Sequence, residues 1–103
     1  MQRPENIKAL QANGRRVLDT AAPVKPTSFK IWAELILAVS MVYMDAFWAD
    51  MQYEDADQDL VTRARDLIAT MRDGYKDLEI SQEDQSELTK ILALVDEIIA
   101  GPH

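Results

Sequence analysis

The chain has 103 residues, a single histidine, no cysteine and a formal net charge of −7. This length predicts one domain spanning residues 1–103, and the lack of cysteine excludes disulfides and thiolate metal sites. The first residues hold no apolar run followed by a small-residue cleavage site. We therefore expect no secretory signal and a cytoplasmic location.

The charge is spread unevenly along the chain. Residues 1–33 hold six basic and two acidic residues, whereas residues 34–103 hold five basic and sixteen acidic residues. The amino-terminal segment can therefore be attracted to the acidic remainder of its own chain or of a neighbour. Because phosphate would repel a chain with an isoelectric point near 4.5, we expect no direct nucleic-acid binding.

Residues 4–20 are expected to form the first helix, since Pro4 suits the first helical position. Its apolar face comprises Ile7, Leu10, Val17 and Leu18. Asn13-Gly14 is a turn signal within this helix, so we expect a break there. The alternative is a continuous helix whose backbone lies against another segment at Gly14. Pro23 and Pro26 then predict an extended connector.

Residues 28–53 are expected to form a long central helix, capped by Thr27 or Ser28. Its polar positions fall on a narrow strip that comprises Lys30, Glu34, Asp45 and Gln52, together with Ala38 and Met41. Nearly every other position is apolar, whereas a surface helix needs an apolar stripe of only about 100°. This pattern predicts a helix that is packed on several sides.

The same stretch is nearly long enough to span a membrane, which takes about 20 apolar residues. Glu34 and Asp45 lie inside it, and each acid near the bilayer centre costs about 2.5–3.5 kcal/mol. The flanking segments are amphipathic in the manner of a soluble bundle. We therefore expect a soluble protein with no membrane contact.

Two further helices are expected at residues 57–78 and 82–100. The third, capped by Asp55 or Asp57, carries an apolar seam made of Leu60, Ala64, Leu67, Ile68, Met71, Tyr75 and Leu78. Gly74 either ends it by adopting a positive φ or lies at a bend beyond which the helix continues. Ser81 is expected to begin the fourth helix and Gly101-Pro102 to stop it. The fold class is all-α, a small domain of four helices.

The sequence offers little for catalysis. His103 is the terminal residue, and the calcium-type spacing of acids from Asp55 to Asp59 lacks the glycine and the glutamate of an EF-hand. Glu34 and Asp45 would lie about 16 Å apart along the helix, too far to act on one bond. We expect no enzymatic activity, no metal and no cofactor.

The apolar excess of the central helix is the remaining signal. The other three helices cannot easily cover it, so we expect residues 31–51 to form a homodimer interface or to bind a partner protein. The predicted interface comprises Trp32, Leu35, Ile36, Leu37, Val39, Tyr43, Met44, Phe47, Trp48 and Met51.

Small, acidic, cysteine-free helical chains have the general character of bacterial and phage-encoded inhibitors, by analogy of size and charge alone. Our leading hypothesis is an inhibitor or anti-activator whose apolar helix face occludes a regulatory protein, for example a transcription regulator. One alternative is an acidic inhibitor, like anti-CRISPR proteins, that mimics nucleic acid and blocks a basic binding site. Another is a structural subunit of a larger assembly.

Overall fold

The computed structural model describes the backbone of residues 4–54 and 56–101, with side chains from residue 7 onward. Within these ranges the chain is entirely helical and contains no strand, which confirms the predicted all-α class with four helices. The elements are α1 (Pro4–Ala21), α2 (Phe29–Gln52), α3 (Gln58–Met71), the 3₁₀ segments η1 (Arg72–Asp77) and η2 (Gln82–Asp84), and α4 (Gln85–Ala100). Asp55, Pro102 and His103 lie outside the described residues.

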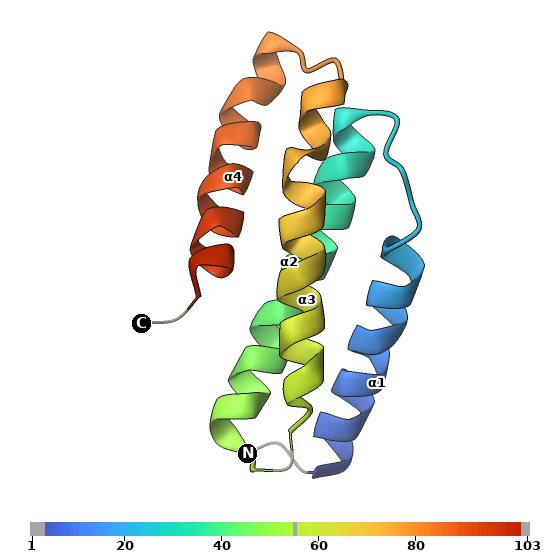
Figure 1. The fold of residues 1–103 in the computed structure, drawn as a ribbon, viewed down its shortest axis with the longest axis vertical. Coiled ribbons are helices and arrows are strands. Elements are labelled where there is room, and N and C mark those ends of the chain that lie inside the picture. The colour runs from blue at the N-terminus through green and yellow to red at the C-terminus, as the bar shows by residue number, and fades with distance from the viewer. Residues whose placement is uncertain (1–3, 55, 102–103) are drawn as a thin grey trace.

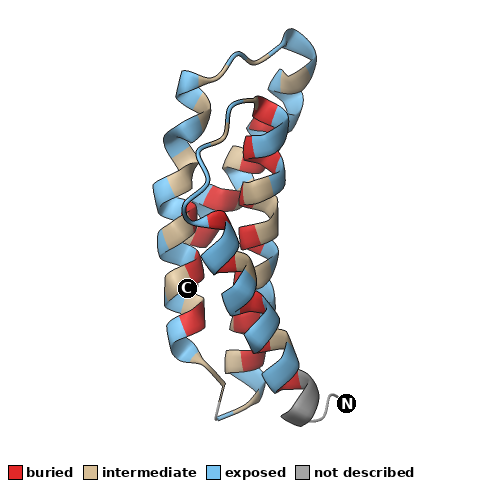
Figure 2. Cartoon of the chain, turned by 90° about the vertical axis from the view of Figure 1, so that its right-hand side faces the viewer, coloured by how far each residue is buried: buried red, intermediate tan, exposed pale blue. Residues whose placement is uncertain are grey.

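The four helices form an elongated bundle of 44 × 29 × 21 Å (Figure 1). α2 and α3 run side by side through its centre, and α2 contacts every other α-helix. α1 flanks the lower part of the bundle and α4 the upper part, as drawn in Figure 1. Because of this stagger, neither outer helix runs the full length of α2. Figure 2 shows the buried residues gathered between the helices and the exposed residues outside.

Side-chain caps set the helix starts, as the sequence predicts. The Ser28 hydroxyl accepts a hydrogen bond from the Ile31 amide at 3.3 Å, and the Asp57 carboxylate accepts one from the Leu60 amide at 3.1 Å. At the other end of the chain, α4 stops where Gly101 adopts a φ of 82°, a conformation that glycine enters without steric cost.

The expected break at Gly14 is wrong, because α1 runs unbroken from Pro4 to Ala21. Gly14 instead lies where α1 packs closely on its neighbours. A Cβ atom at this position would lie 3.1 Å from the Val42 Cγ1 atom and 3.2 Å from the Leu60 Cδ2 atom. The missing side chain therefore lets α1 approach both α2 and α3, and this packing outweighs the helix propensity of about 1 kcal/mol that glycine forfeits.

We expect Gly14→Val to lower the free energy of unfolding by about 1–3 kcal/mol, because the added carbons overlap Val42 and Leu60. Urea denaturation followed by circular dichroism measures the change. Ala12→Val is the matched control, since Ala12 is exposed on the same helix and the change there costs about 0.5 kcal/mol. Equal losses in the two variants would contradict the close packing of α1.

Trp32 joins the start of α2 to the end of α3. Its indole is fully buried, and its Nε1 atom donates a hydrogen bond of 2.9 Å to the carbonyl oxygen of Met71, the last residue of α3. The chain then continues as η1, in which Tyr75 packs against the indole with ring centroids 5.6 Å apart. A Cβ atom on Gly74 would lie 3.3 Å from the indole Cδ1 atom.

The sequence left open whether Gly74 ends the third helix through a positive φ or lies at a bend in it. Gly101 is the one residue with positive φ among those described, so Gly74 does not end α3 by the left-handed route. The helix tightens to 3₁₀ geometry after Met71 and continues to Asp77, which corrects the expected α-helical range of residues 57–78. A small residue at position 74 lets η1 lie directly on the Trp32 ring.

Arg72 forms the ion pairs that link η1 to α4. Its Nε and Nη2 atoms donate to the two carboxylate oxygens of Asp96 at 2.6 and 3.1 Å, and its Nη1 atom donates to Asp73 at 2.8 Å. These hydrogen bonds hold the pKa of the Asp96 and Asp73 carboxyls below their usual range and raise the pKa of Arg72. The ionised form of Asp96 is thus favoured by folding.

Because of the ion pair between Arg72 and Asp96, we expect the free energy of unfolding to fall in acid. In the window between its lowered folded pKa and its ordinary value near pH 4, Asp96 binds fewer protons in the folded chain than in the unfolded chain. Its contribution is therefore complete above that window and is lost as the pH falls through the folded pKa.

Urea denaturation at pH 3, 4 and 6 measures this loss. We expect Asp96→Asn to show a smaller loss between pH 6 and pH 3 than the wild type. Glu97→Gln, which changes the neighbouring residue on α4, should keep the wild-type dependence, since Glu97 makes no ion pair with any residue that the structure describes. If both variants respond to pH as the wild type does, Asp96 is not the group responsible.

Candidate protein-interaction surface

The ten residues of the predicted interface divide between the core and the surface of the single chain. Four are buried, with at most 7% of each side chain exposed: Trp32, Ile36, Val39 and Tyr43. Three are half-buried and pack against that core: Leu35, Leu37 and Phe47. Three are exposed: Met44, Trp48 and Met51. The prediction is corrected accordingly, because the four buried residues already contact the chain's own helices.

One exposed residue was missed. Met41 is 62% exposed and lies between Leu37 and Met44 on the same face of α2. On the helical wheel of α2 it falls in the polar strip with Lys30 and Glu34. Its side chain is nevertheless apolar. Met41 follows Leu37 by four residues and precedes Met44 by three, and this helical spacing could have identified it as part of the same face.

The exposed α2 stripe, as we name it, comprises Leu37, Met41, Met44, Trp48 and Met51. Successive members are separated by four, three, four and three residues. At 100° per residue they fall within an arc of about 80°, and they extend for about 21 Å along the helix. The stripe is therefore a continuous apolar ridge on one side of α2.

The carboxyl end of the stripe is exposed because α2 is longer than the helices that flank it. α2 has 24 residues, whereas α4 has 16 and α1 has 18. In Figure 1 the ribbon of α4 ends well above the carboxyl end of α2, so α4 does not cover the last turns of α2, where Trp48 and Met51 lie. Trp48 contacts Tyr53 edge-on with ring centroids 6.1 Å apart and still leaves 39% of its surface exposed.

Glu34, Asp45 and Gln52 border the stripe on one side, and all three are exposed. The carboxylates of Glu34 and Asp45 form no ion pair with any residue described in the structure, so both lie at the solvent edge of α2. The basic residues of α1 do not reach them. Arg15 pairs with Asp57 at 2.6 Å instead, which draws the basic segment to the start of α3.

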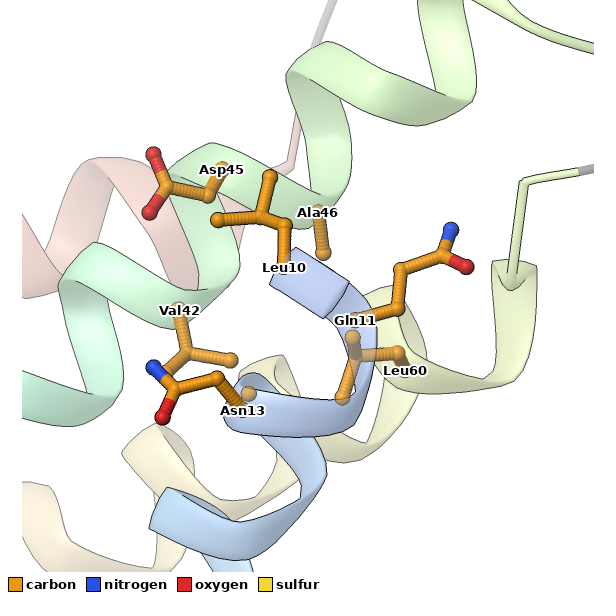
Figure 3. A pocket seen from close by; sticks show the side chains of 8 residues that line it. Leu10, Gln11, Asn13, Val42, Asp45, Ala46 and Leu60 are labelled. Carbon is orange, nitrogen blue, oxygen red and sulfur yellow. The ribbon is translucent and has the colours of Figure 1, made fainter. Parts of the chain in front are cut away.

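The pocket between α1 and α2 is too small for a ligand. A pocket of about 20 Å³ between α1 and α2 is lined by Leu10, Gln11, Asn13, Gly14, Val42, Asp45, Ala46 and Leu60 (Figure 3). This volume is comparable to one water molecule and is far below the roughly 300 Å³ of a small ligand site. The Nε2 atom of Gln11 is buried and has no hydrogen-bond partner among the described residues, and in Figure 3 its amide points away from Asn13.

Two larger hollows lie on the surface. A groove of about 460 Å³ between the connector and α3 is lined by Ala22, Val24, Lys25, Pro26, Trp32, Leu67, Thr70, Met71, Gly74 and Asp77. An apolar hollow of about 280 Å³ between α1 and α2 is lined by Arg16, Val17, Thr20, Ala21, Leu35 and Ala38. Neither contains a nucleophile with a neighbouring base, which acyl or phosphoryl transfer would require.

Charged groups elsewhere do not gather into a site. Across the side chains of residues 7–54 and 56–101, no three acidic or histidine groups come close enough to hold a metal ion. Two arginines are engaged in ion pairs: Arg63 pairs with Asp19 at 2.9 Å, and Arg72 pairs with Asp73 and Asp96. Asp57 caps α3 and pairs with Arg15, so this acid is engaged within the chain.

α2 is also the one helix in the described residues that could cross a membrane by length and composition. Its most apolar window is 39% buried inside the chain, and core helices of water-soluble proteins share these properties.

The chain matches no protein-family model, no curated protein sequence and no solved structure. Any function must therefore be argued from the geometry of this surface.

The two tryptophans of α2 should differ in their contribution to stability. We expect Trp32→Ala to lower the free energy of unfolding by about 3–5 kcal/mol, because it leaves a large cavity and an unpaired Met71 carbonyl. Trp48→Ala should cost about 0.5–1 kcal/mol, as expected for a partly exposed side chain. Urea denaturation at low protein concentration, where association does not contribute, gives both values. Similar losses would contradict the division of α2 into a core face and a surface face.

Proposed function

We propose that the protein is a soluble, cytoplasmic protein-protein interaction module without enzymatic activity, and that it associates through the exposed α2 stripe. One observation carries this proposal: four exposed apolar residues, Met41, Met44, Trp48 and Met51, continue from the half-buried Leu37 as one ridge along α2. Such a ridge is favourable to bury, at about 25 cal/mol for each Å² of apolar surface removed from water.

The residue types support protein binding. Tryptophan and methionine are enriched in protein interfaces, and methionine adapts its unbranched side chain to different surfaces. Trp48 lies in the carboxyl half of the stripe, with Met44 and Met51 on either side of it. This arrangement resembles a hot spot, in which one large aromatic side chain is surrounded by adaptable apolar contacts.

The proposed mode of action is occlusion. By burying its stripe on a regulatory protein, for example a transcription regulator, the module would cover a surface that the regulator needs for its own dimerisation or ligand. The first partner that we propose is a second copy of the chain, which would make the protein a homodimer in the absence of a target.

Sedimentation equilibrium tests the proposal. We expect the wild type to show twice the 11.7 kDa mass of the chain, and Trp48→Glu to show the mass of one chain with unchanged helical circular dichroism. Ile31→Glu is the matched control, because Ile31 is also on α2 and is 40% exposed, against 39% for Trp48, but lies outside the stripe. This variant should remain dimeric.

Two outcomes would overturn the proposal. If Ile31→Glu dissociates as readily as Trp48→Glu, the stripe is not the contact surface. If the wild type sediments as a single chain, self-association through α2 is excluded. In that case affinity capture from the native cells with the same two variants shows whether a protein binds the stripe, since only Trp48→Glu would then release it.

A further inference from the structure

The groove between the connector and α3 has the size of a small-ligand site. The connector joins α1 to α2 at the upper right of Figure 1 and forms one wall of the groove, and α3 and η1 form the other. Its volume of about 460 Å³ lies within the range of roughly 300–1,000 Å³ that is typical of such sites. None of the five residues of the exposed α2 stripe lines it, so binding in this groove is independent of the proposed function.

The change from α-helical to 3₁₀ geometry brings Asp77 to this groove. Leu67, Thr70 and Met71 line the groove from α3, and Gly74 and Asp77 line it from η1. In a 3₁₀-helix, residues three apart lie directly above one another, so Gly74 and Asp77 continue the face on which Met71 lies. In an α-helix, Asp77 would be turned away from Met71 by about 120°. The wall therefore runs from apolar side chains to a carboxylate, with no side chain at residue 74 between them.

The connector forms a stiff opposite wall. Its lining residues are Ala22, Val24, Lys25 and Pro26. The rings of Pro23 and Pro26 each fix a backbone φ angle. Between them, the Val24 amide donates a hydrogen bond of 3.1 Å to the carbonyl oxygen of Ala21, the last residue of α1. A wall that is ordered before binding reduces the entropy that a ligand must overcome.

Two charges of opposite sign are unpaired at this groove. Lys25 lies on the connector wall and Asp77 on the η1 wall, and both are exposed. Neither forms an ion pair or a hydrogen bond with any residue that the structure describes. The Thr70 hydroxyl donates its hydrogen to the Asp66 carbonyl at 3.0 Å, so its oxygen can still accept one. The groove thus offers one cation, two acceptors and otherwise apolar side chains.

We propose that this groove binds an apolar zwitterion, which an apolar amino acid or a short apolar peptide with free ends provides. Lys25 binds the carboxylate of the ligand, Asp77 binds its ammonium group, and its side chains pack on Val24, Leu67 and Met71. Exposed ion pairs contribute little free energy, so apolar contact supplies most of the affinity. The two charges set the orientation of the ligand and discriminate against molecules that carry only one of them.

Two-dimensional ¹H–¹⁵N NMR locates the binding site, because the two tryptophans report on different surfaces. Leucyl-leucine and leucine are titrated separately at pH 7 up to millimolar concentrations. We expect leucyl-leucine to shift the indole N–H signal of Trp32, which lines the groove and is hydrogen-bonded to Met71, and to leave that of Trp48 in place. An equal response to leucine would support the site and show that the amino acid suffices. No shift of Trp32, or an equal shift of Trp48, would overturn the proposal.

Paired changes in protein and ligand test the two charges. Asp77→Asn and Lys25→Gln should each raise the dissociation constant of leucyl-leucine by about two- to fivefold, as expected for an exposed ion pair, with unchanged helical circular dichroism. The analogue 4-methylpentanoyl-leucine lacks the ammonium group. It should bind the wild type and Lys25→Gln more weakly than leucyl-leucine does, but Asp77→Asn equally well, because the two changes remove the same interaction.

Asp66→Asn is the matched control for charge. Asp66 is exposed on α3, precedes Leu67 and does not line the groove, so this variant should keep the wild-type affinity. If Asp66→Asn weakens binding as much as Asp77→Asn, only the general acidity of the chain attracts the ligand and the proposal is wrong. Losses from Asp77→Asn and from the analogue that add together would also overturn the assigned ammonium contact.

Discussion

The structure depends on the mismatch between the length of α2 and the lengths of the helices around it. α2 has 24 residues, or about 36 Å at 1.5 Å per residue, whereas α4 would cover about 24 Å of it. α1 and α4 are staggered along the bundle, so each covers a different part of α2. The face that neither helix reaches carries Met41, Trp48 and Met51. α2 is apolar on nearly all sides, so it has one apolar face buried in the core and another exposed to water.

The two ends of α2 are held in different ways. Near its start, Trp32 is enclosed by Phe29 and Tyr75 and donates a hydrogen bond to the Met71 carbonyl, so a polar group of α3 is satisfied inside the core. Near its end, Trp48 has one aromatic neighbour in Tyr53 and remains partly in water. The same residue type thus supports the fold at one end and stays available for contact at the other.

Most of the fold could be predicted from the sequence because its signals are local. Caps at Ser28 and Asp57, and a glycine stop at residue 101, each act within one turn of the chain. Gly14 shows where such reasoning fails. Its helix propensity and its Asn13 neighbour favour a break, but the helix continues because of contacts with Val42 and Leu60, which are distant in sequence.

The candidate surface was harder to predict for a related reason. The wheel of α2 shows that apolar residues exceed what one face needs, but it does not show which face the other helices cover. That depends on how far α1 and α4 extend along α2, which their sequences do not state. Trp32 and Ile36 were consequently grouped with Trp48, although the first two are core. Met41 was left out of the predicted interface because it lies among polar residues on the wheel, although its spacing of four residues from Leu37 and three from Met44 matches the stripe.

The composition of the stripe bears on how one surface could serve two partners. Three of its five members are methionines, whose flexible side chains can fill irregular gaps at small energetic cost. A stripe of β-branched residues would fit one partner helix precisely and others poorly, because those side chains are stiff. If the homodimer and a target compete for the same methionines, dimerisation withholds the stripe until the target is present. The affinity of the dimer then sets the target concentration at which occlusion begins, since every chain bound to its copy must first be released.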